Sequence, residues 1–365
     1  MNQEYIQRLE KIEAELDRWL PENIEAAIKK TAWAENVFPG MGKNINAASL
    51  NHLLVPLRDI LSRGGKRWRP LLMTLVCETL GGGEAAYPLA PLVEFCHNAS
   101  LVHDDIEDNS DERRGKPAVH RIYGVDTAIN SGSFFYFLAL NCIESYAGGK
   151  KEFIYKLWAE YMRKLHLGQA MDISWHRNIE FVPNMEEYYV MCGMKTGSLA
   201  RLAAELGVFA AGANLRSQAF ASTEAARQLG EAAEKLGIGF QILDDVKNLT
   251  SGAPGKKRGD DIVEGKKSLP VLMYLRKYPE RKTQIFNCFF QAKTNGIAAP
   301  ETEEMIEVLA ASGILAEAEE KGKAFLTEAS IVFGFPRLDT IASAGGFSAS
   351  EEACALLNGL ISQIS

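Results

Sequence analysis

The sequence has no run of apolar residues long enough to cross a membrane. Its longest uncharged run, residues 127–143, falls short of the ~20 residues that a spanning helix needs, and it contains Asn130, Ser131 and Ser133. The first residues of the chain include neither a basic segment nor an apolar stretch of the kind that forms a signal peptide. We therefore expect a cytoplasmic protein with no membrane span.

Paired cysteines and a basic excess are also lacking. The six cysteines lie singly, with no CxxC pair, which predicts reduced thiols in the core. Forty Lys and Arg residues stand against 47 Asp and Glu residues, a formal net charge of −7. Because nucleic-acid binding relies on a clustered basic excess, this balance predicts no nucleic-acid partner. HExxH, GxSxG, Walker and GxGxxG motifs are absent, which disfavours a zinc site and the hydrolase, P-loop and dinucleotide-binding classes.

Apolar residues recur at helical spacing through most of the chain. Between Tyr5 and Leu20 they follow one another at three- and four-residue intervals, with charged residues between them. No segment has the long β-branched alternation of a sheet, so we predict an all-α fold. Helices are expected at residues 5–20, 50–61, 71–80, 86–108, 124–147, 151–174, 185–212, 223–248 and 268–278, with several more in the C-terminal third.

The length of 365 residues allows about two domains, but also one large helical domain. The breaks, which are rich in glycine, are short, and none resembles a linker. We therefore predict a single domain over residues 1–365 whose motifs meet at one cavity. Within it, residues 1–45 form an N-terminal helical extension and residues from about 295 to 365 form a peripheral helical region.

The first candidate site is a DDxxD pattern formed by Asp104, Asp105 and Asp108. On a helix, residues 104 and 108 lie about one turn apart on the same face, where their like charges repel. Hard cations such as Mg²⁺ prefer carboxylate oxygens and share their coordination shell with substrate phosphates. The alternative is a solvated acidic helix end, and this motif alone does not distinguish the two.

A second cluster, Asp244, Asp245 and Asn248, repeats the spacing at the end of another apolar helix. Gln241 lies one turn earlier. Two copies of one metal-ligand geometry are much less expected by chance than one. Asn248 supplies a neutral oxygen in place of a third carboxylate, which should weaken metal contact there but not abolish it.

Basic residues accompany both acidic clusters, beside glycines that allow phosphate oxygens to approach closely. This alternation favours a diphosphate held through metal on one side and by cations on the other. A solvated surface patch is the alternative for each group, and for Lys257 and Lys267 we favour it. The chemistry of His97 alone favours a core histidine with satisfied hydrogen bonds over a diphosphate ligand. The grouped cations are Lys66, Arg67, Arg69, Arg113, Arg114, Lys116, Lys195, Lys256, Lys257, Lys266 and Lys267.

These motifs resemble those of the trans-isoprenyl diphosphate synthases, the polyprenyl synthetase family. The resemblance runs from about Gly64 to Leu272 through GGKRWRP, DDIEDNSDERRGKPAVH, LHLGQAMDI, KTGSL, GFQILDDVKN and GDDIVEGKKSLP. It is strongest to geranylgeranyl diphosphate synthases of the eukaryotic type, which share a segment similar to AINSGSFFYFLAL and have Asn as the last residue of the second motif. The resemblance implies a helical bundle of the isoprenoid synthase type around a deep central cavity.

The resemblance also implies roles for individual residues. Three Mg²⁺ ions would be bound by Asp104, Asp105, Asp108 and Asp244, with Asp245 and Asn248 supporting. An allylic diphosphate would contact Arg113, Lys195, Lys256 and Lys266, while Thr196 and Gln241 would guide its head and the developing cation. Isopentenyl diphosphate would be held by Lys66, Arg69, His97 and Arg114, which makes a ligand role for His97 more probable than its own chemistry suggested. Asp261 also matches a family position.

Product length would depend on the depth of the tunnel below the first acidic motif. Ala99 and Ser100 are small, so the tunnel is not plugged near its mouth. Tyr136 and Phe137 match an aromatic pair that forms the floor in the geranylgeranyl branch, which predicts a C20 product. The alternative for these aromatic residues is ordinary helix core.

Other classes compete with this hypothesis. They are a synthase of longer-chain or farnesyl products, a class I terpene cyclase, a regulatory subunit and a plain helical scaffold. The residues that would hold isopentenyl diphosphate disfavour a cyclase, which needs no such site. Because both acidic clusters keep their paired aspartates, a regulatory subunit, which normally loses one cluster, and a plain scaffold, which needs neither, are also disfavoured. The family generally forms homodimers, so we expect one here.

Overall fold

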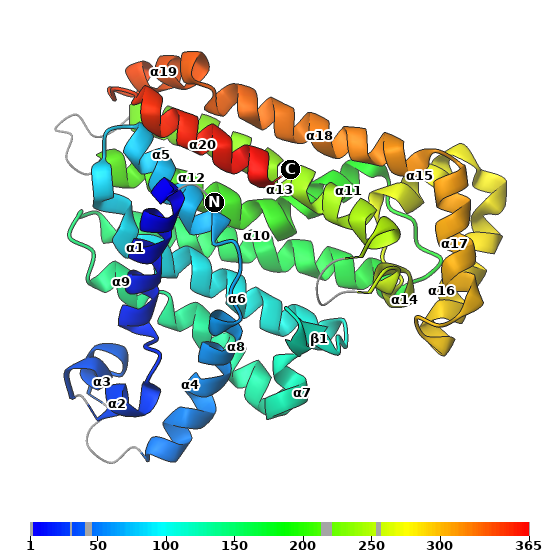
Figure 1. Cartoon of the computed structure of the whole chain (residues 1–365), viewed down its shortest axis with the longest axis horizontal. Coiled ribbons are helices and arrows are strands. Elements are labelled where there is room, and N and C mark those ends of the chain that lie inside the picture. Colours follow the sequence, from blue (N-terminus) through cyan, green and yellow to red (C-terminus); the bar gives the residue numbers. More distant parts are fainter. Residues whose placement is uncertain (1–2, 30, 41–45, 213–220, 253–256, 365) are drawn as a thin grey trace. The chain divides into compact units, whose positions relative to one another are not determined.

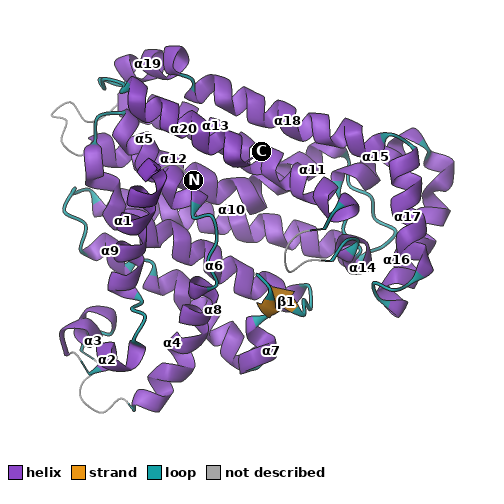
Figure 2. Cartoon of the chain, viewed as in Figure 1, coloured by secondary structure: helices purple, strands orange, loops and turns teal. Residues whose placement is uncertain are grey.

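The computed structural model describes residues 3–29, 31–40, 46–212, 221–252 and 257–364 (Figure 1). Helices form nearly all of its regular structure, as Figure 2 shows. Among the described residues the only sheet is a two-stranded antiparallel hairpin, β1 (Glu112–Arg113) with β2 (Lys116–Pro117). The predicted all-α class is therefore confirmed.

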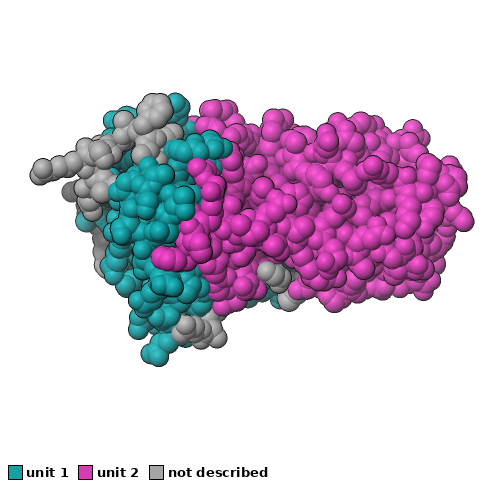
Figure 3. Space-filling model, turned by 90° about the horizontal axis from the view of Figure 1, so that it is seen from above, with its two compact units in different colours: residues 1–158, 202–227, 338–357 teal, residues 159–201, 228–337, 358–365 magenta. Residues whose placement is uncertain are grey.

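The chain divides into two compact units, which Figure 3 colours separately. Unit 1 comprises residues 1–158, 202–227 and 338–357, and unit 2 comprises residues 159–201, 228–337 and 358–365. Each unit therefore combines segments that are far apart in the sequence. The assignment of all 365 residues to one domain stays a prediction.

Unit 1 is built around helices that bury most of their apolar residues. In α5, Leu72, Met73 and Leu75 are fully buried, as expected for a segment that is apolar almost all round. The predicted N-terminal extension contributes to this core, because Ile12 and Leu16 of α1 are also fully buried. The elements of this unit are α1 (Gln3–Trp19), α2 (Ile24–Ile28), α3 (Thr31–Val37), α4 (Ala47–Ser62), α5 (Trp68–Thr79), η1 (Gly83–Leu89), α6 (Ala90–Glu107), α7 (Val119–Tyr123), α8 (Val125–Leu138) and α9 (Asn141–Glu144).

The remaining elements lie in unit 2 or extend from one unit into the other. An apolar cluster among them includes Tyr188, Ile242 and Phe289, all buried. These elements are α10 (Lys151–Arg177), α11 (Met185–Cys192), η2 (Gly193–Gly197), α12 (Ser198–Gly212), α13 (Ala221–Thr250), α14 (Asp260–Glu264), α15 (Leu269–Lys277), η3 (Pro279–Arg281), α16 (Lys282–Asn295), α17 (Pro300–Ala311), α18 (Ile314–Phe333), α19 (Phe335–Ala344) and α20 (Glu351–Ile364).

The long helices agree with the spans predicted from periodicity, but several details differ. The short helices α7 and α14 lie outside the predicted spans, and the spans 86–108 and 185–212 include, respectively, part of the 3₁₀ segment η1 and the π-helical η2. The helix predicted over residues 124–147 is broken between α8 and α9. There the Leu140 N–H bonds to the Phe137 carbonyl and the Ile143 N–H to the Leu140 carbonyl. These three-residue bonds tighten the backbone and end the regular α-helix, which a hydrophobic pattern does not reveal.

Two expectations drawn from absences also bear on the fold. All six cysteines are buried, as predicted for core residues. No helix in the described part of the chain is long and apolar enough to cross a bilayer. The cytoplasmic location stays a prediction.

Candidate functional site

The first acidic motif lies where α6 ends. Asp104 and Asp105 occupy its last turn, and Asp108 is the residue that caps it. Asp105 is fully buried, and its Oδ2 atom has no hydrogen-bond partner. Arg113 neutralises part of the charge, because its Nε lies 2.7 Å from Asp105 Oδ1 and its Nη2 lies 3.3 Å from Asp104 Oδ2. Burial nevertheless raises the pKa of Asp105 to about 6.

The β1–β2 hairpin directs two consecutive arginines to different partners. Arg114 and Gly115 form its two-residue turn, both with positive φ, as a type I′ turn requires. Arg113 reaches the acidic motif, whereas Arg114 donates to the carbonyls of Gly64 and Ile60. The hairpin thus links the RRGK segment to the GGKRWRP loop, although its strands are too short for a sequence pattern to predict.

Three of the residues predicted to hold isopentenyl diphosphate, two arginines and a histidine, gather in unit 1. Arg69 Nη1 lies 3.4 Å from His97 Nε2, and a guanidinium only donates, so His97 is assigned as neutral with its proton on Nδ1. Burial, followed by the charges of Arg69 and Arg114, lowers the pKa of His97 well below its usual value. Burial likewise lowers the pKa values of Arg69 and Arg114 to about 10. Lys66, in the same loop, is exposed.

A buried ion pair that the sequence did not suggest supports this loop. Arg67 adopts the left-handed region, with φ of 47°, and its Nη1 lies 2.8 Å from Glu94 Oε1. Glu94 is only 2% exposed. A single acid within the apolar run of α6 was the available signal, because such a charge is normally paired when it is buried.

In the second acidic motif, Asp245 is occupied by protein donors. The Tyr188 hydroxyl donates to its Oδ2 at 2.6 Å, Gln241 Nε2 to its Oδ1 at 2.9 Å, and the Leu269 N–H to Oδ2 at 3.3 Å. Burial, followed by the neighbouring Asp261 carboxylate, raises the pKa of Asp245 to about 7. Asp245 thus joins α11, α13 and α15 inside unit 2, while Asp244 is partly exposed.

Asn248 is likewise occupied by backbone groups. Its Nδ2 donates to the Lys257 carbonyl at 3.4 Å, and its Oδ1 accepts from the Asp261 N–H at 3.3 Å. The side chain is 3% exposed. Asn248 therefore holds the turn before α14, a role that needs both a donor and an acceptor.

The predicted residues Lys195 and Thr196 lie in η2, a π-helical turn between α11 and α12. The Thr196 hydroxyl donates to Gln241 Oε1 at 2.8 Å. Gly237 of α13 makes this contact possible, because a Cβ there would lie 2.5 Å from the Cα of Gly197. Single π-helical turns are frequent at functional sites, and here one brings together residues that the sequence separates by 45 positions.

Lys195 has a partner that the motifs contained without an assigned role. Its Nζ lies 2.6 Å from Oδ2 of Asp172, the aspartate of the GQAMDI segment. Burial opposes ionisation of Asp172, but Lys195 and Lys266 outweigh it and hold the pKa below its usual value. An acid in an otherwise apolar part of a quoted motif was the signal that could have identified it.

The predicted lysines of the glycine-rich loop after the second motif differ in their surroundings. Lys266 Nζ lies 2.5 Å from Glu264 Oε2 and 3.8 Å from Asp261 Oδ1. Lys256 lies outside the described residues. Lys257 is exposed, as expected.

Our prediction that Lys267 is a solvated surface residue is wrong. Lys267 is 3% exposed, its Nζ donates to the Gly265 carbonyl at 2.9 Å, and it lies 4.4 Å from the ring centre of Phe289. Burial, followed by the charge of Lys293, lowers its pKa to about 8. The carbonyl and the aromatic ring replace water around the ammonium group, and the ring comes from Phe289, which the local sequence does not reveal.

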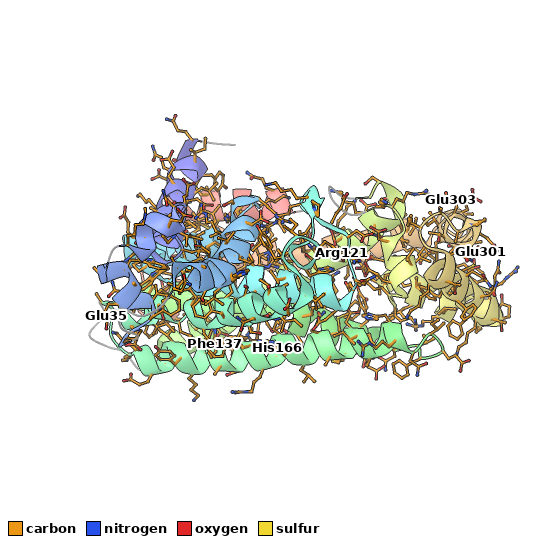
Figure 4. All side chains as sticks on the ribbon, turned by 90° about the horizontal axis from the view of Figure 1, so that it is seen from below. Glu35, Arg121, Phe137, His166, Glu301 and Glu303 are labelled. Carbon is orange, nitrogen blue, oxygen red and sulfur yellow. The ribbon has the colours of Figure 1, made fainter. Side chains whose placement is uncertain are left out.

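The residues predicted to set product length lie on α6 and α8. Ala99 is fully buried and Ser100 partly so. Tyr136 is 8% exposed and stacks on His103 with ring centres 5.8 Å apart. Phe137, whose position is labelled in Figure 4, is by contrast 60% exposed by its surface area. A tunnel floor in this unit therefore depends on Tyr136, because Phe137 points away from the core.

Within the described residues, no three His, Cys, Asp or Glu side chains are already arranged around a metal position. The carboxylates at the end of α6 are instead held by Arg113. The motifs thus supply hard oxygen donors beside cations.

Comparison with known proteins identifies the family. The chain matches the polyprenyl synthetase family over residues 51–306. It is 36% identical over 257 residues to a short chain isoprenyl diphosphate synthase of Methanocaldococcus jannaschii, across 69% of this chain and 74% of that protein. It is also 36% identical to a geranylgeranyl pyrophosphate synthase of Neocamarosporium betae, across 66% of each chain.

The fold agrees with this assignment. A crystal structure of a polyprenyl synthase from Caulobacter crescentus CB15 is similar with a TM-score of 0.70 and 25% identity, over 96% of this chain and 97% of that one. The predicted isoprenoid synthase fold and the suspected family are both confirmed. The chain therefore belongs to the polyprenyl synthetase family, and it is a trans-prenyltransferase of the isoprenyl diphosphate synthase type.

Proposed function

We propose that this prenyltransferase condenses isopentenyl diphosphate with an allylic diphosphate, head to tail, and that its main product is geranylgeranyl diphosphate. The observation that carries the proposal is the crowding of Arg69, Arg114 and neutral His97 in unit 1. Burial lowers the pKa values of all three groups, and the two arginines also repel each other. A cluster of cations that destabilise one another is suited to bind an anion such as a diphosphate.

We propose that the first and second acidic motifs bind divalent metal ions, three Mg²⁺ in all. Asp104, Asp105, Asp108 and Asp244 have the oxygen donors that fit, and the buried Asp105 Oδ2 lacks any hydrogen-bond donor. Mg²⁺ is usually held by one or two carboxylates plus substrate phosphates, so a complete protein cage is not required. The Caulobacter crescentus relative was crystallised with calcium and isoprenyl diphosphate. When bound, such ions neutralise the charge of a departing diphosphate.

The side chains of the protein complete the reaction. We assign Lys195, which pairs with Asp172, and Arg113, which pairs with Asp105, to stabilise the negative charge that develops as the allylic C–O bond breaks. The side-chain oxygens of Thr196 and Gln241 carry partial negative charge and would stabilise the positive charge that develops on the allylic carbon. The isopentenyl double bond, oriented by the cations of unit 1, attacks that carbon and forms the new C–C bond. A proton then leaves to the released diphosphate, and exclusion of water prevents quenching of the cation.

The C20 product follows from the residues on α6 and α8. Ala99 and Ser100 are small, and we assign the buried Tyr136, which stacks on His103, as the floor of the space that the growing chain would occupy. The test is to incubate the purified protein with Mg²⁺, farnesyl diphosphate and isopentenyl diphosphate, and to size the products. We expect mainly C20. A dominant product of C30 or longer overturns the floor assignment, and failure to condense any allylic starter overturns the proposed reaction.

One observation favours a longer product as the second candidate. Because Phe137 is 60% exposed, the floor rests on one aromatic side chain rather than two. Tyr136→Ala then separates the candidates: it should lengthen the product if Tyr136 is the floor and leave it unchanged if the floor lies elsewhere.

The class I terpene cyclase alternative is tested at the isopentenyl site. Lys66→Ala and Arg69→Ala should each raise the KM for isopentenyl diphosphate. Full activity of both variants with unchanged KM would remove that site from the proposal. Release of diphosphate from the allylic substrate without consumption of isopentenyl diphosphate would favour a cyclase.

A homodimer is part of the proposal. Four apolar side chains of α7 and α8, Ile122, Val125, Ile129 and Phe137, are between 46% and 60% exposed. Several large apolar residues exposed on neighbouring turns are typical of a surface covered by a partner. Light scattering should give a dimer for the wild-type protein and a monomer for Ile129→Lys. A wild-type monomer at micromolar concentration would contradict the dimer.

A further inference from the structure

Two polar residues of α6 are buried beside the cation cluster without a role in the reaction above. Glu94 and Asn98 lie one turn apart and are 2% and 0% exposed. Asp105 follows two turns after Asn98 on the same face of the helix. One face of α6 therefore carries three buried polar side chains toward the loops that contain the arginines.

The hydrogen bonds of Asn98 fix its orientation. Its Nδ2 lies 2.8 Å from Glu94 Oε1 and 2.8 Å from the Glu94 carbonyl, so this end donates. Its Oδ1 accepts from Arg114 Nη1 at 3.2 Å. Because a guanidinium only donates and a carboxylate only accepts, the amide cannot be reversed without losing these bonds.

Asn98 thus connects Arg114 to the buried Glu94–Arg67 pair. Glu94 Oε1 accepts from both Arg67 Nη1 and Asn98 Nδ2, each at 2.8 Å. Arg67 in turn bonds to the carbonyls of Leu61 and Gly64 at the start of the GGKRWRP loop. The loop and the β1–β2 turn are therefore tied to the same point on α6.

The neighbouring arginine is held independently. Arg113 bonds to Asp104 and Asp105, and no hydrogen bond joins it to Asn98 in the described structure. A change at Asn98 therefore acts on Arg114 without removing a partner of Arg113. This separation makes a selective effect on one of the two substrates measurable.

We infer that Asn98 is a positioning residue for isopentenyl diphosphate, which orients Arg114 by coupling it to the buried Glu94–Arg67 pair. The inference rests on the proposed function in assigning Arg114 to that substrate. Removal of the amide leaves Arg114 held only by backbone carbonyls, so its guanidinium can turn away from the bound diphosphate. The allylic substrate, contacted by Arg113, should be unaffected.

The test compares Asn98→Leu, which has a similar volume but no polar atoms, with the wild type. We expect the KM for isopentenyl diphosphate to rise about tenfold, the scale of one hydrogen bond to a charged group, while the KM for the allylic substrate changes less than about twofold. Asn98→Asp keeps an acceptor for Arg114 but loses the donor to Glu94 and places a second carboxylate beside it, so it should not restore the wild-type KM for isopentenyl diphosphate. Thr79→Val is the matched control, because it removes another buried side-chain bond, from Thr79 Oγ1 to the Leu75 carbonyl, away from the arginines.

Calorimetric titration of isopentenyl diphosphate alone gives a second measurement that needs no turnover. Weaker binding by Asn98→Leu but not by Thr79→Val supports the inference. Equal affinity of Asn98→Leu and wild type, or equal rises in both KM values, overturns it. If the wild type binds isopentenyl diphosphate but makes no product, the proposed reaction fails, while the calorimetric comparison still decides the role of Asn98.

Discussion

The ends of α6 and α13 carry nearly the same motif, but the protein uses the two differently. At the end of α6, Asp105 keeps one buried carboxylate oxygen without a hydrogen-bond donor, and Arg113 is the charge partner of Asp104 and Asp105. On α13, Asp245 accepts three hydrogen bonds from its own unit. Asn248 bonds two backbone groups of the following turn.

This difference shows that two motifs with the same residue spacing can differ in how many of their carboxylates are available to a metal ion. A carboxylate already satisfied by protein donors gains little from a metal ion, whereas one held mainly by a single arginine can exchange it for a metal. In the second motif Asp244 remains the ligand candidate, and the other two residues build the structure around it. In the first motif the three carboxylates remain closer to the role that the spacing predicts.

The largest expected effect is on activity at the first motif. Asp104→Asn should lower kcat by about 10²-fold or more, since metal stabilisation of developing charge contributes several kcal/mol. Product formation measures this, and the thermal midpoint should change little because Asp104 is partly exposed. Glu107→Gln, an exposed carboxylate within the same motif, is the control and should change kcat less than about threefold. Near-normal activity of Asp104→Asn would remove the first motif from the reaction.

The second motif should respond chiefly in stability. Tyr188→Phe removes the 2.6 Å bond to the buried Asp245, so the free energy of unfolding should fall by about 1.5–3 kcal/mol. Chemical denaturation measures it. Tyr189→Phe is the matched control, because Tyr189 packs against Tyr188 but does not bond to Asp245. Equal losses in both variants would mean that the bond to Asp245 contributes nothing specific.

The surroundings of His97 also predict a pH effect in unit 1. Burial, followed by the charges of Arg69, Arg114, Arg67 and Arg113, lowers the pKa of His97, so below pH ~6.5 the unfolded chain binds a proton that the folded protein does not. The free energy of unfolding therefore decreases as the pH falls below ~6.5, by up to about 1.4 kcal/mol per pH unit for this group. Asp105 and Asp245, whose pKa values are raised, act in the opposite direction in this range, so denaturation between pH 7.5 and 5 should compare His97→Gln with the wild type: as the pH falls, the variant should lose less stability, or gain more. An unchanged slope would contradict a neutral His97.

The smallest expected effect comes from making the second motif match the first. Asn248→Asp removes the donor to the Lys257 carbonyl and places a carboxylate beside that oxygen. The free energy of unfolding should fall by about 1 kcal/mol, with no gain in activity or in apparent Mg²⁺ affinity. Asn248→Ala serves as the comparison for loss of both bonds. If Asn248→Asp reached half-maximal activity at a lower Mg²⁺ concentration than the wild type, position 248 would be able to act as a metal ligand.

Much of the fold could be predicted from periodicity, because helix faces repeat at three- and four-residue spacing. The break between α8 and α9 could not, since it depends on backbone bonds at Leu140. Among candidate site residues, Thr196 and Gln241 were predicted and lie in contact. Glu94 and Asp172 were missed because a buried acid and a solvated one look alike in a sequence.

By itself, the sequence determined the helical class, the family and the two acidic motifs, since these depend on residue type and local spacing. Only the tertiary structure decided which members of each motif are already bound. Asp245 is occupied by Tyr188, 57 residues away, and Lys267 is buried beside Phe289. The physical reason is that hydrogen bonding and burial depend on side chains distant in sequence, whereas helical spacing does not.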